Sequence, residues 1–162
     1  MLRLILINTV VIIFTHFCRK FLHKYTLTFR NVKNKIAFWT VSQCRTDNFR
    51  EKYVEALKQF IEIDVFGECS EIECPGKLQE NCVERVGNNY WFYLAFENSN
   101  CQDYITDKLW KILNSNIVPV VMGGGNYTRD APEKSVINVN DFPSVKALAD
   151  YLIHLTKYPV SL

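Results

Sequence analysis

Hydrogen-bonding side chains gather directly after an apolar run near the middle of the chain. The run is Phe92–Phe96, and Glu97, Asn98, Ser99 and Asn100 follow it. A buried strand that ends in such a polar turn is typical of a ligand site, because ligands of open α/β sheets bind beyond the carboxyl ends of the strands. A strand that only filled a core would not need so many polar groups at its exit. The sequence therefore predicts a ligand site after residue 96.

Three further side chains, Tyr104, Asp107 and Lys108, follow at helical spacing. Residues three and four positions apart on a helix share one face, so these side chains could act together. Lys108 could neutralise a phosphate, and the Asp107 carboxylate could accept hydrogen bonds from a pair of sugar hydroxyls. The alternative interpretation is a surface ion pair beside a half-buried tyrosine. Trp110, on the same stretch, is interpreted as a core residue rather than as a stacking platform.

Arg50 lies in the first turn of a predicted helix. A helix dipole disfavours a cation near the N-terminus, so a phosphate partner would explain this arginine, although exposed arginines without a ligand are also common. The glycines of Gly123–Gly125 could likewise bring backbone close to a phosphate or a ribose. Their spacing is not that of a dinucleotide-binding fingerprint, and a tight turn is the favoured interpretation.

These residues must be positioned by strands that alternate with helices. Asp103 and Ser144 are predicted N-caps. Apolar runs predict strands at Ile36–Thr40, Ile63–Phe66, Tyr90–Phe96, Ile117–Met122 and Val136–Val139. Apolar residues at three- and four-residue intervals predict helices at Phe49–Phe60, Tyr104–Leu113 and Ser144–Thr156. This alternation indicates an α/β fold with a parallel sheet and helices on its faces.

Composition and charge exclude several classes of protein. The chain has 162 residues, 48% of them hydrophobic, which fits one globular domain with a substantial core. The net charge of +2 is too small for a general nucleic-acid binder. Residues 1–34 form a separate apolar and basic segment that contains no Asp or Glu. Its apolar run, Leu2–Phe17, is interpreted as a signal peptide or signal anchor, as a buried element, or as sequence outside the mature fold.

The cysteines suggest an oxidising compartment, and their spacing does not match a paired zinc site. Gly67–Asn89 is a long, irregular connection that is either functional or stapled by disulfides. The sequon that begins at Asn126 predicts N-glycosylation, in agreement with a luminal or secreted setting. Disulfides are expected among Cys44, Cys69, Cys74, Cys82 and Cys101, with one cysteine free or paired outside the chain.

Three stretches, in order and with the approximate spacing of the family, resemble glycosyltransferase family 10, the alpha-1,3-fucosyltransferases. The stretch FYLAFENSNCQDYITDKLW resembles the family's signature, and the other two resemble its first strand-to-helix segment and its later part. The stretches are Phe92–Trp110, Val41–Leu57 and Val118–Leu152. The resemblance covers the chain from about residue 35 to the C-terminus.

The resemblance implies a Rossmann-like fold for residues 35–162, equivalent to the donor-binding, C-terminal half of a two-domain GT-B glycosyltransferase. It implies transfer of fucose from GDP-fucose with inversion, without a metal or other cofactor, onto a glycan acceptor that a second domain would bind. Arg50 and Lys108 would contact the diphosphate, Asn98 and Tyr104 would line the donor pocket, and Asp107 would hold the ribose hydroxyls. The implied setting is the Golgi lumen, with a possible membrane anchor.

The chain also departs from the family's pattern. Asp107 stands where the family usually has Glu, one methylene longer. Residues 1–34 stand in place of the acceptor-binding domain, which would hold the general base, and the chain ends earlier than the family normally does. We therefore expect little transfer by this chain alone. The alternative function is a non-catalytic fragment that binds a nucleotide sugar or a partner.

Overall fold

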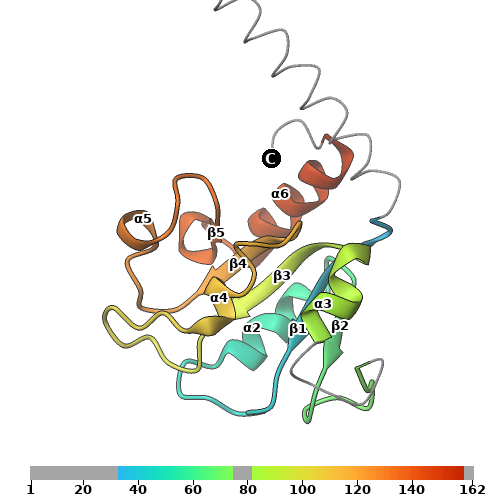
Figure 1. The fold of residues 1–162 in the computed structure, drawn as a ribbon, viewed down its shortest axis with the longest axis horizontal. Helices are drawn as coiled ribbons and strands as arrows, with labels where there is room; N and C mark the ends of the chain where they lie inside the picture. Colours follow the sequence, from blue (N-terminus) through green and yellow to red (C-terminus); the bar gives the residue numbers. More distant parts are fainter. Residues whose placement is uncertain (1–32, 75–81, 159–162) are drawn as a thin grey trace, which may run out of the picture.

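The computed structural model describes residues 33–74 and 82–158, and its centre is a five-stranded parallel sheet (Figure 1). The strand order is β2-β1-β3-β4-β5, and every neighbouring pair is parallel. The strands are β1 Lys35–Thr40, β2 Ile63–Phe66, β3 Tyr90–Phe96, β4 Val118–Met122 and β5 Ile137–Asn138. The predicted parallel sheet is confirmed.

Helices cover both faces of this sheet, as predicted. The sequence of β3, YWFYLAF, is buried at every position because β3 is the central strand and both of its faces are packed. Side chains alternate between the faces along each strand. The helices are α2 Arg50–Leu57, α3 Cys82–Val86, α4 Asp107–Trp110, α5 Tyr127–Asp130 and α6 Val145–Lys157, with short 3₁₀ turns at Gly87–Asn89 and Val139–Asp141. One core holds Phe92 and Leu94 with α2 and α6, and the other holds Tyr93 and Ala95 with α3, α4 and α5.

The strand order contains a switch point between β1 and β3. From β1 the chain passes through α2 to β2 at one edge, and then returns to the other side of β1 to form β3. The helices that follow β1 and β3 therefore pack on opposite faces of the sheet. Crevices at such switch points are where open α/β sheets bind ligands. The predicted site after residue 96 lies at this point.

The helix after β3 is shorter than predicted and begins later. The predicted cap at Asp103 is wrong: Thr106 is the N-cap, and its side chain accepts from the Lys108 backbone N–H. Asp103 instead adopts left-handed backbone, with φ of 58°, and its N–H donates to the Gly124 carbonyl. Trp110, expected in the core, is 41% exposed, because so short a helix buries only Leu109.

The connection between β2 and β3 is stapled by disulfides. Cys44 pairs with Cys69, and Cys74 pairs with Cys82, which leaves Cys101 as the free cysteine of the described residues. This agrees with the expectation of disulfides among these five cysteines. Part of the connection predicted to be irregular is helical, since α3 begins at Cys82.

Almost all of the N-terminal segment, residues 1–34, lies outside the described residues, so its three interpretations stay open. Within the part of the chain that the structure describes, no helix combines the length and the apolar composition that a membrane crossing requires.

The N-cap of α6 provides a test of local stability. The predicted cap at Ser144 is confirmed, because its hydroxyl accepts from the Ala147 N–H at 3.1 Å. We expect Ser144→Ala to lower the free energy of unfolding by about 1 kcal/mol, since it leaves this N–H without its acceptor. Urea denaturation measures the change. Ser144→Asp keeps an acceptor and should retain wild-type stability; equal losses for both variants would contradict the assigned cap.

Candidate ligand site

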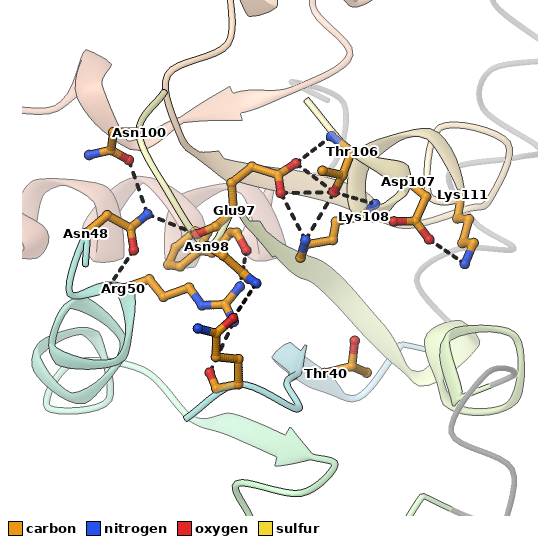
Figure 2. Close-up of polar contacts among 12 residues, drawn as sticks. Thr40, Asn48, Arg50, Glu97, Asn98, Asn100, Thr106, Asp107, Lys108 and Lys111 are labelled. Carbon is orange, nitrogen blue, oxygen red and sulfur yellow. Dashed lines mark hydrogen bonds and ion pairs between the residues drawn. The ribbon is translucent and has the colours of Figure 1, made fainter. Parts of the chain in front are cut away.

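Two loops meet at the switch point and are joined by side-chain amides (Figure 2). The loop after β1 contributes Gln43 and Asn48, and the loop after β3 contributes Glu97, Asn98 and Asn100. The Asn98 amide donates to Gln43 Oε1 at 2.7 Å. The Asn48 amide donates to the Glu97 carbonyl at 2.9 Å and to Asn100 Oδ1 at 3.1 Å. The structure therefore brings the predicted polar turn against the segment that precedes Arg50.

Arg50 is buried between these two loops, with only 2% of its surface exposed. Nη1 donates to the Phe96 carbonyl at 2.6 Å, and Nη2 donates to the Gln43 carbonyl at 3.2 Å. The guanidinium lies 5.3 Å from the Trp39 ring centroid, a cation–π distance. Burial lowers the pKa of Arg50, while the negative charge of Glu97 raises it. Arg50 is thus a cation at the switch point that also fixes the ends of the loops.

Lys108 is directed into the same crevice by a buried carboxylate. Glu97 is 1% exposed, and its Oε2 accepts from Lys108 Nζ at 3.0 Å. The Thr106 hydroxyl lies 3.1 Å from the same ammonium. The Lys108 side chain is 25% exposed, so its ammonium can reach a ligand. From the sequence, Glu97 was one of the polar residues of the predicted turn without a role of its own; its signal was a carboxylate placed directly after a fully apolar strand.

Asp107 and Tyr104 do not form with Lys108 the arrangement that the sequence predicts. Tyr104 precedes α4, so the expectation that Tyr104, Asp107 and Lys108 share one helix face is wrong. The Asp107 side chain is 65% exposed and pairs with Lys111 Nζ at 2.6 Å, as Figure 2 shows. This ion pair lowers the pKa of Asp107. The surface ion pair considered as an alternative does exist, but its cation is Lys111.

The glycines after β4 allow the loop after β3 to pack closely. A Cβ atom on Gly124 would lie 2.2 Å from the Cys101 carbonyl oxygen, and one on Gly125 would lie 2.2 Å from Ile105 Cγ1. The favoured interpretation of these glycines was a tight turn. Their further role is to let two loops touch, which holds the loop between Glu97 and Thr106 in place.

Gly124→Ala should therefore disturb the site through its backbone. The added methyl group meets carbonyl oxygens rather than a flexible side chain, so we expect a loss of about 2 kcal/mol in unfolding free energy, as for overpacking elsewhere. Thermal melting followed by circular dichroism measures it. Ala147→Gly in α6 is the reference for a change in backbone freedom without a close contact. A melting temperature of Gly124→Ala equal to that of the wild type would contradict the close approach.

Unpaired polar atoms mark the same edge of the sheet. Among the described residues, the buried side-chain atoms without a hydrogen-bond partner are Arg50 Nε, Asn98 Oδ1 and the Tyr127 hydroxyl. Burial, with the charge of Glu97, raises the pKa of Tyr127 to about 12, so this phenol keeps its proton. A buried polar atom without a partner costs about 1–3 kcal/mol. Two of the three belong to the residues predicted to contact a ligand.

Cavities also occur elsewhere in the domain. One of about 650 Å³ lies between α2 and β2, and one of about 560 Å³ adjoins the amino ends of β4 and β5. Their linings do not include Asn98, Glu97 or Lys108. We place the candidate site at the switch point because the buried cation, the exposed ammonium and the unpaired polar atoms converge there. Within the described ranges, no three metal-ligating side chains lie together.

The fold and the site define a doubly wound α/β domain whose candidate ligand site lies at the switch point of a parallel sheet. Residues 30–161 match the family model described as "Glycosyltransferase family 10 (fucosyltransferase) C-term". The chain therefore belongs to glycosyltransferase family 10, which confirms the resemblance seen in its sequence.

Named relatives agree with this assignment. The chain is 42% identical to "Alpha-(1,3)-fucosyltransferase C" of Drosophila melanogaster over 120 aligned residues. This alignment covers 74% of this chain and 28% of the relative. It is 44% identical to "Glycoprotein 3-alpha-L-fucosyltransferase A" of the same organism over 123 aligned residues. This alignment covers 74% of this chain and 24% of the relative. The chain thus spans about a quarter of the length of these relatives.

Solved structures share the fold. A crystal structure of an alpha1,3-fucosyltransferase matches with a TM-score of 0.65 at 25% identity, and covers 79% of this chain and 36% of that chain. The structure of alpha1,3-fucosyltransferase with GDP-fucose matches with a TM-score of 0.64 at 24% identity, over 79% of this chain and 37% of that chain. These matches confirm the Rossmann-like α/β architecture.

Proposed function

We propose that this chain supplies the GDP-fucose-binding half of an alpha-1,3-fucosyltransferase that transfers fucose with inversion. The observation that carries the proposal is the convergence of Arg50, Asn98 and Lys108 at the switch point, where Arg50 Nε and Asn98 Oδ1 have no partner among the described residues. A nucleotide diphosphate offers acceptors to the cations, and a sugar nucleotide offers hydroxyl donors to the amide oxygen.

The chemistry requires stabilisation of the leaving group. As the glycosidic bond to the diphosphate breaks, negative charge grows on GDP, and fixed cations aimed at that charge lower the barrier. Arg50 and Lys108 are the cations proposed for this role, which would make a metal ion unnecessary. Dialysis against a chelator should then leave GDP binding unchanged.

Asp107 and Tyr104 are proposed to complete the donor pocket, with Asp107 on the ribose hydroxyls. This role requires the Asp107 carboxylate to leave Lys111, and the exposure of the pair makes that exchange inexpensive, because exposed ion pairs contribute only about 0–1 kcal/mol. The general base and most acceptor contacts would come from an acceptor-binding domain, in a GT-B arrangement. We propose the Golgi lumen, with membrane attachment, as the setting.

Calorimetry tests the donor proposal directly. The chain should bind GDP and GDP-fucose, and guanosine should bind much more weakly because it lacks the diphosphate. ADP is the matched control for diphosphate binding without the guanine base. Absence of any heat with GDP and GDP-fucose, in protein shown to be folded, would sink the proposal.

The exposed Trp110 favours a second candidate function, in which this domain binds a partner chain without catalysing transfer. Sedimentation velocity at rising concentration separates the two: self-association abolished by Trp110→Ser would support the partner-binding function, whereas a monomer throughout would count against it.

We also propose that Asn126 is N-glycosylated. Its side chain is exposed and its Oδ1 caps α5 by accepting from the Arg129 N–H at 3.0 Å. When the chain is expressed in a secretory pathway, endoglycosidase treatment should raise its electrophoretic mobility, and Asn126→Gln should remove that shift. A shift that persists in the variant, or none in the wild type, would contradict the assignment.

A further inference from the structure

We propose that Glu97 is a positioning residue, which fixes the direction of the Lys108 ammonium so that it meets the diphosphate. This inference rests on the proposed function and deepens it. The contacts of this carboxylate explain how a flexible lysine is held in the crevice.

Both oxygens of the Glu97 carboxylate are engaged by the first turn of α4. Oε1 accepts from the Thr106 backbone N–H at 2.7 Å, and the Thr106 hydroxyl lies 2.9 Å from each carboxylate oxygen. Oε2 accepts from Lys108 Nζ at 3.0 Å. One carboxylate therefore holds both the N-cap residue and the cation of a four-residue helix.

The Lys108 ammonium is directed by these contacts. It has three N–H donors, and within the described residues two of its contacts are Glu97 Oε2 and the Thr106 hydroxyl oxygen, at 3.0 and 3.1 Å. The third donor remains for a ligand. A lysine has rotamer freedom worth about 2 kcal/mol, and the two contacts restrict that freedom before a diphosphate arrives.

Stability alone does not explain the carboxylate. Burying an ion pair takes both charges out of water, and apolar side chains of similar volume often stabilise a fold as well or better. Glu97 is 1% exposed, at the end of a strand whose every residue is apolar or aromatic and buried. We explain the buried carboxylate of Glu97 by its effect on Lys108, whose exposed ammonium it orients.

The test compares ligands with and without the diphosphate. Displacement of a fluorescent GDP gives the dissociation constants of GDP and guanosine for the wild type, Glu97→Gln and Thr106→Val. Glu97→Gln keeps the shape and removes the charge. Thr106→Val keeps Glu97 and removes the hydroxyl that links it to Lys108. Melting curves confirm that each variant is folded.

We expect both variants to bind GDP about tenfold more weakly, the scale of one charge-assisted hydrogen bond, with guanosine affinity within about twofold of wild type. Asp64→Asn is the matched control, because Asp64 also pairs with a lysine, Lys35, but far from the carboxyl end of β3. It should leave the affinities for both ligands unchanged.

Glu97→Gln would overturn the inference by binding GDP as tightly as the wild type, or by losing GDP and guanosine affinity equally. The first result would show that Lys108 needs no orientation, and the second would show general disruption of the fold. Failure of the wild type to bind GDP at all would overturn the proposed function itself, so the two failures are distinguishable.

Discussion

Replacing Arg50 by methionine is expected to lower the free energy of unfolding by about 4 kcal/mol, because a buried and a part-buried carbonyl acceptor lose their donor and a cation–π contact is lost as well. The acceptors are the carbonyls of Phe96 and Gln43, and the ring is Trp39. Methionine keeps much of the volume, so the loss reports the polar contacts rather than a cavity. Urea denaturation at equilibrium measures it.

Arg45 provides the matched control for Arg50. It lies in the loop that leads to α2 and is exposed, so Arg45→Met should change the unfolding free energy by about 0.5 kcal/mol or less, as surface substitutions do. Arg50→Lys keeps the charge but loses the fork of donors, and it should fall between the two. An Arg50→Met variant as stable as Arg45→Met would contradict the buried contacts.

Lys108→Ala is expected to weaken GDP binding about 100-fold, or by about 3 kcal/mol, because the variant removes a charge-assisted contact to the diphosphate and leaves the buried Glu97 without its cation. The melting temperature should fall less than for Arg50→Met, since Glu97 keeps its hydrogen bonds with the backbone N–H and the hydroxyl of Thr106. Calorimetry with GDP measures the affinity.

Lys146→Ala controls for the loss of one lysine. Lys146 also forms a carboxylate pair, with Asp150, but on the exposed surface of α6. It should bind GDP as the wild type does. Undiminished GDP binding by Lys108→Ala would remove Lys108 from the site and would leave Arg50 as the only proposed phosphate contact.

The main elements could be predicted from the sequence because their signals are local. Short, uninterrupted apolar runs gave the strands, and β3 agrees with its prediction at both ends. The cap at Ser144 followed from a hydroxyl placed before an amphipathic helix. The family resemblance assigned both Arg50 and Asn98 to the donor, and the structure brings both residues to one crevice.

The rest of the site depends on packing between distant segments. Asp103 has a good capping side chain, but its N–H donates to Gly124 in the loop after β4 and its carboxylate pairs with Arg129, so Thr106 caps the helix. Glu97 is buried because Thr106 and Lys108 fold back onto it, eleven residues along in the case of Lys108. Such contacts leave no periodic signal in the sequence, and so they were missed.

The location of the nucleotide is the central claim, and amide NMR with GDP tests it most directly. Titration of isotope-labelled protein should move the amide resonances of residues 43–50 and 97–108 most, because these segments form the crevice between β1 and β3. Outside these two segments, the amides of residues that line the cavity beside α2 or the cavity at the amino ends of β4 and β5 should move little. Largest shifts at either cavity, with 97–108 unchanged, would contradict the account.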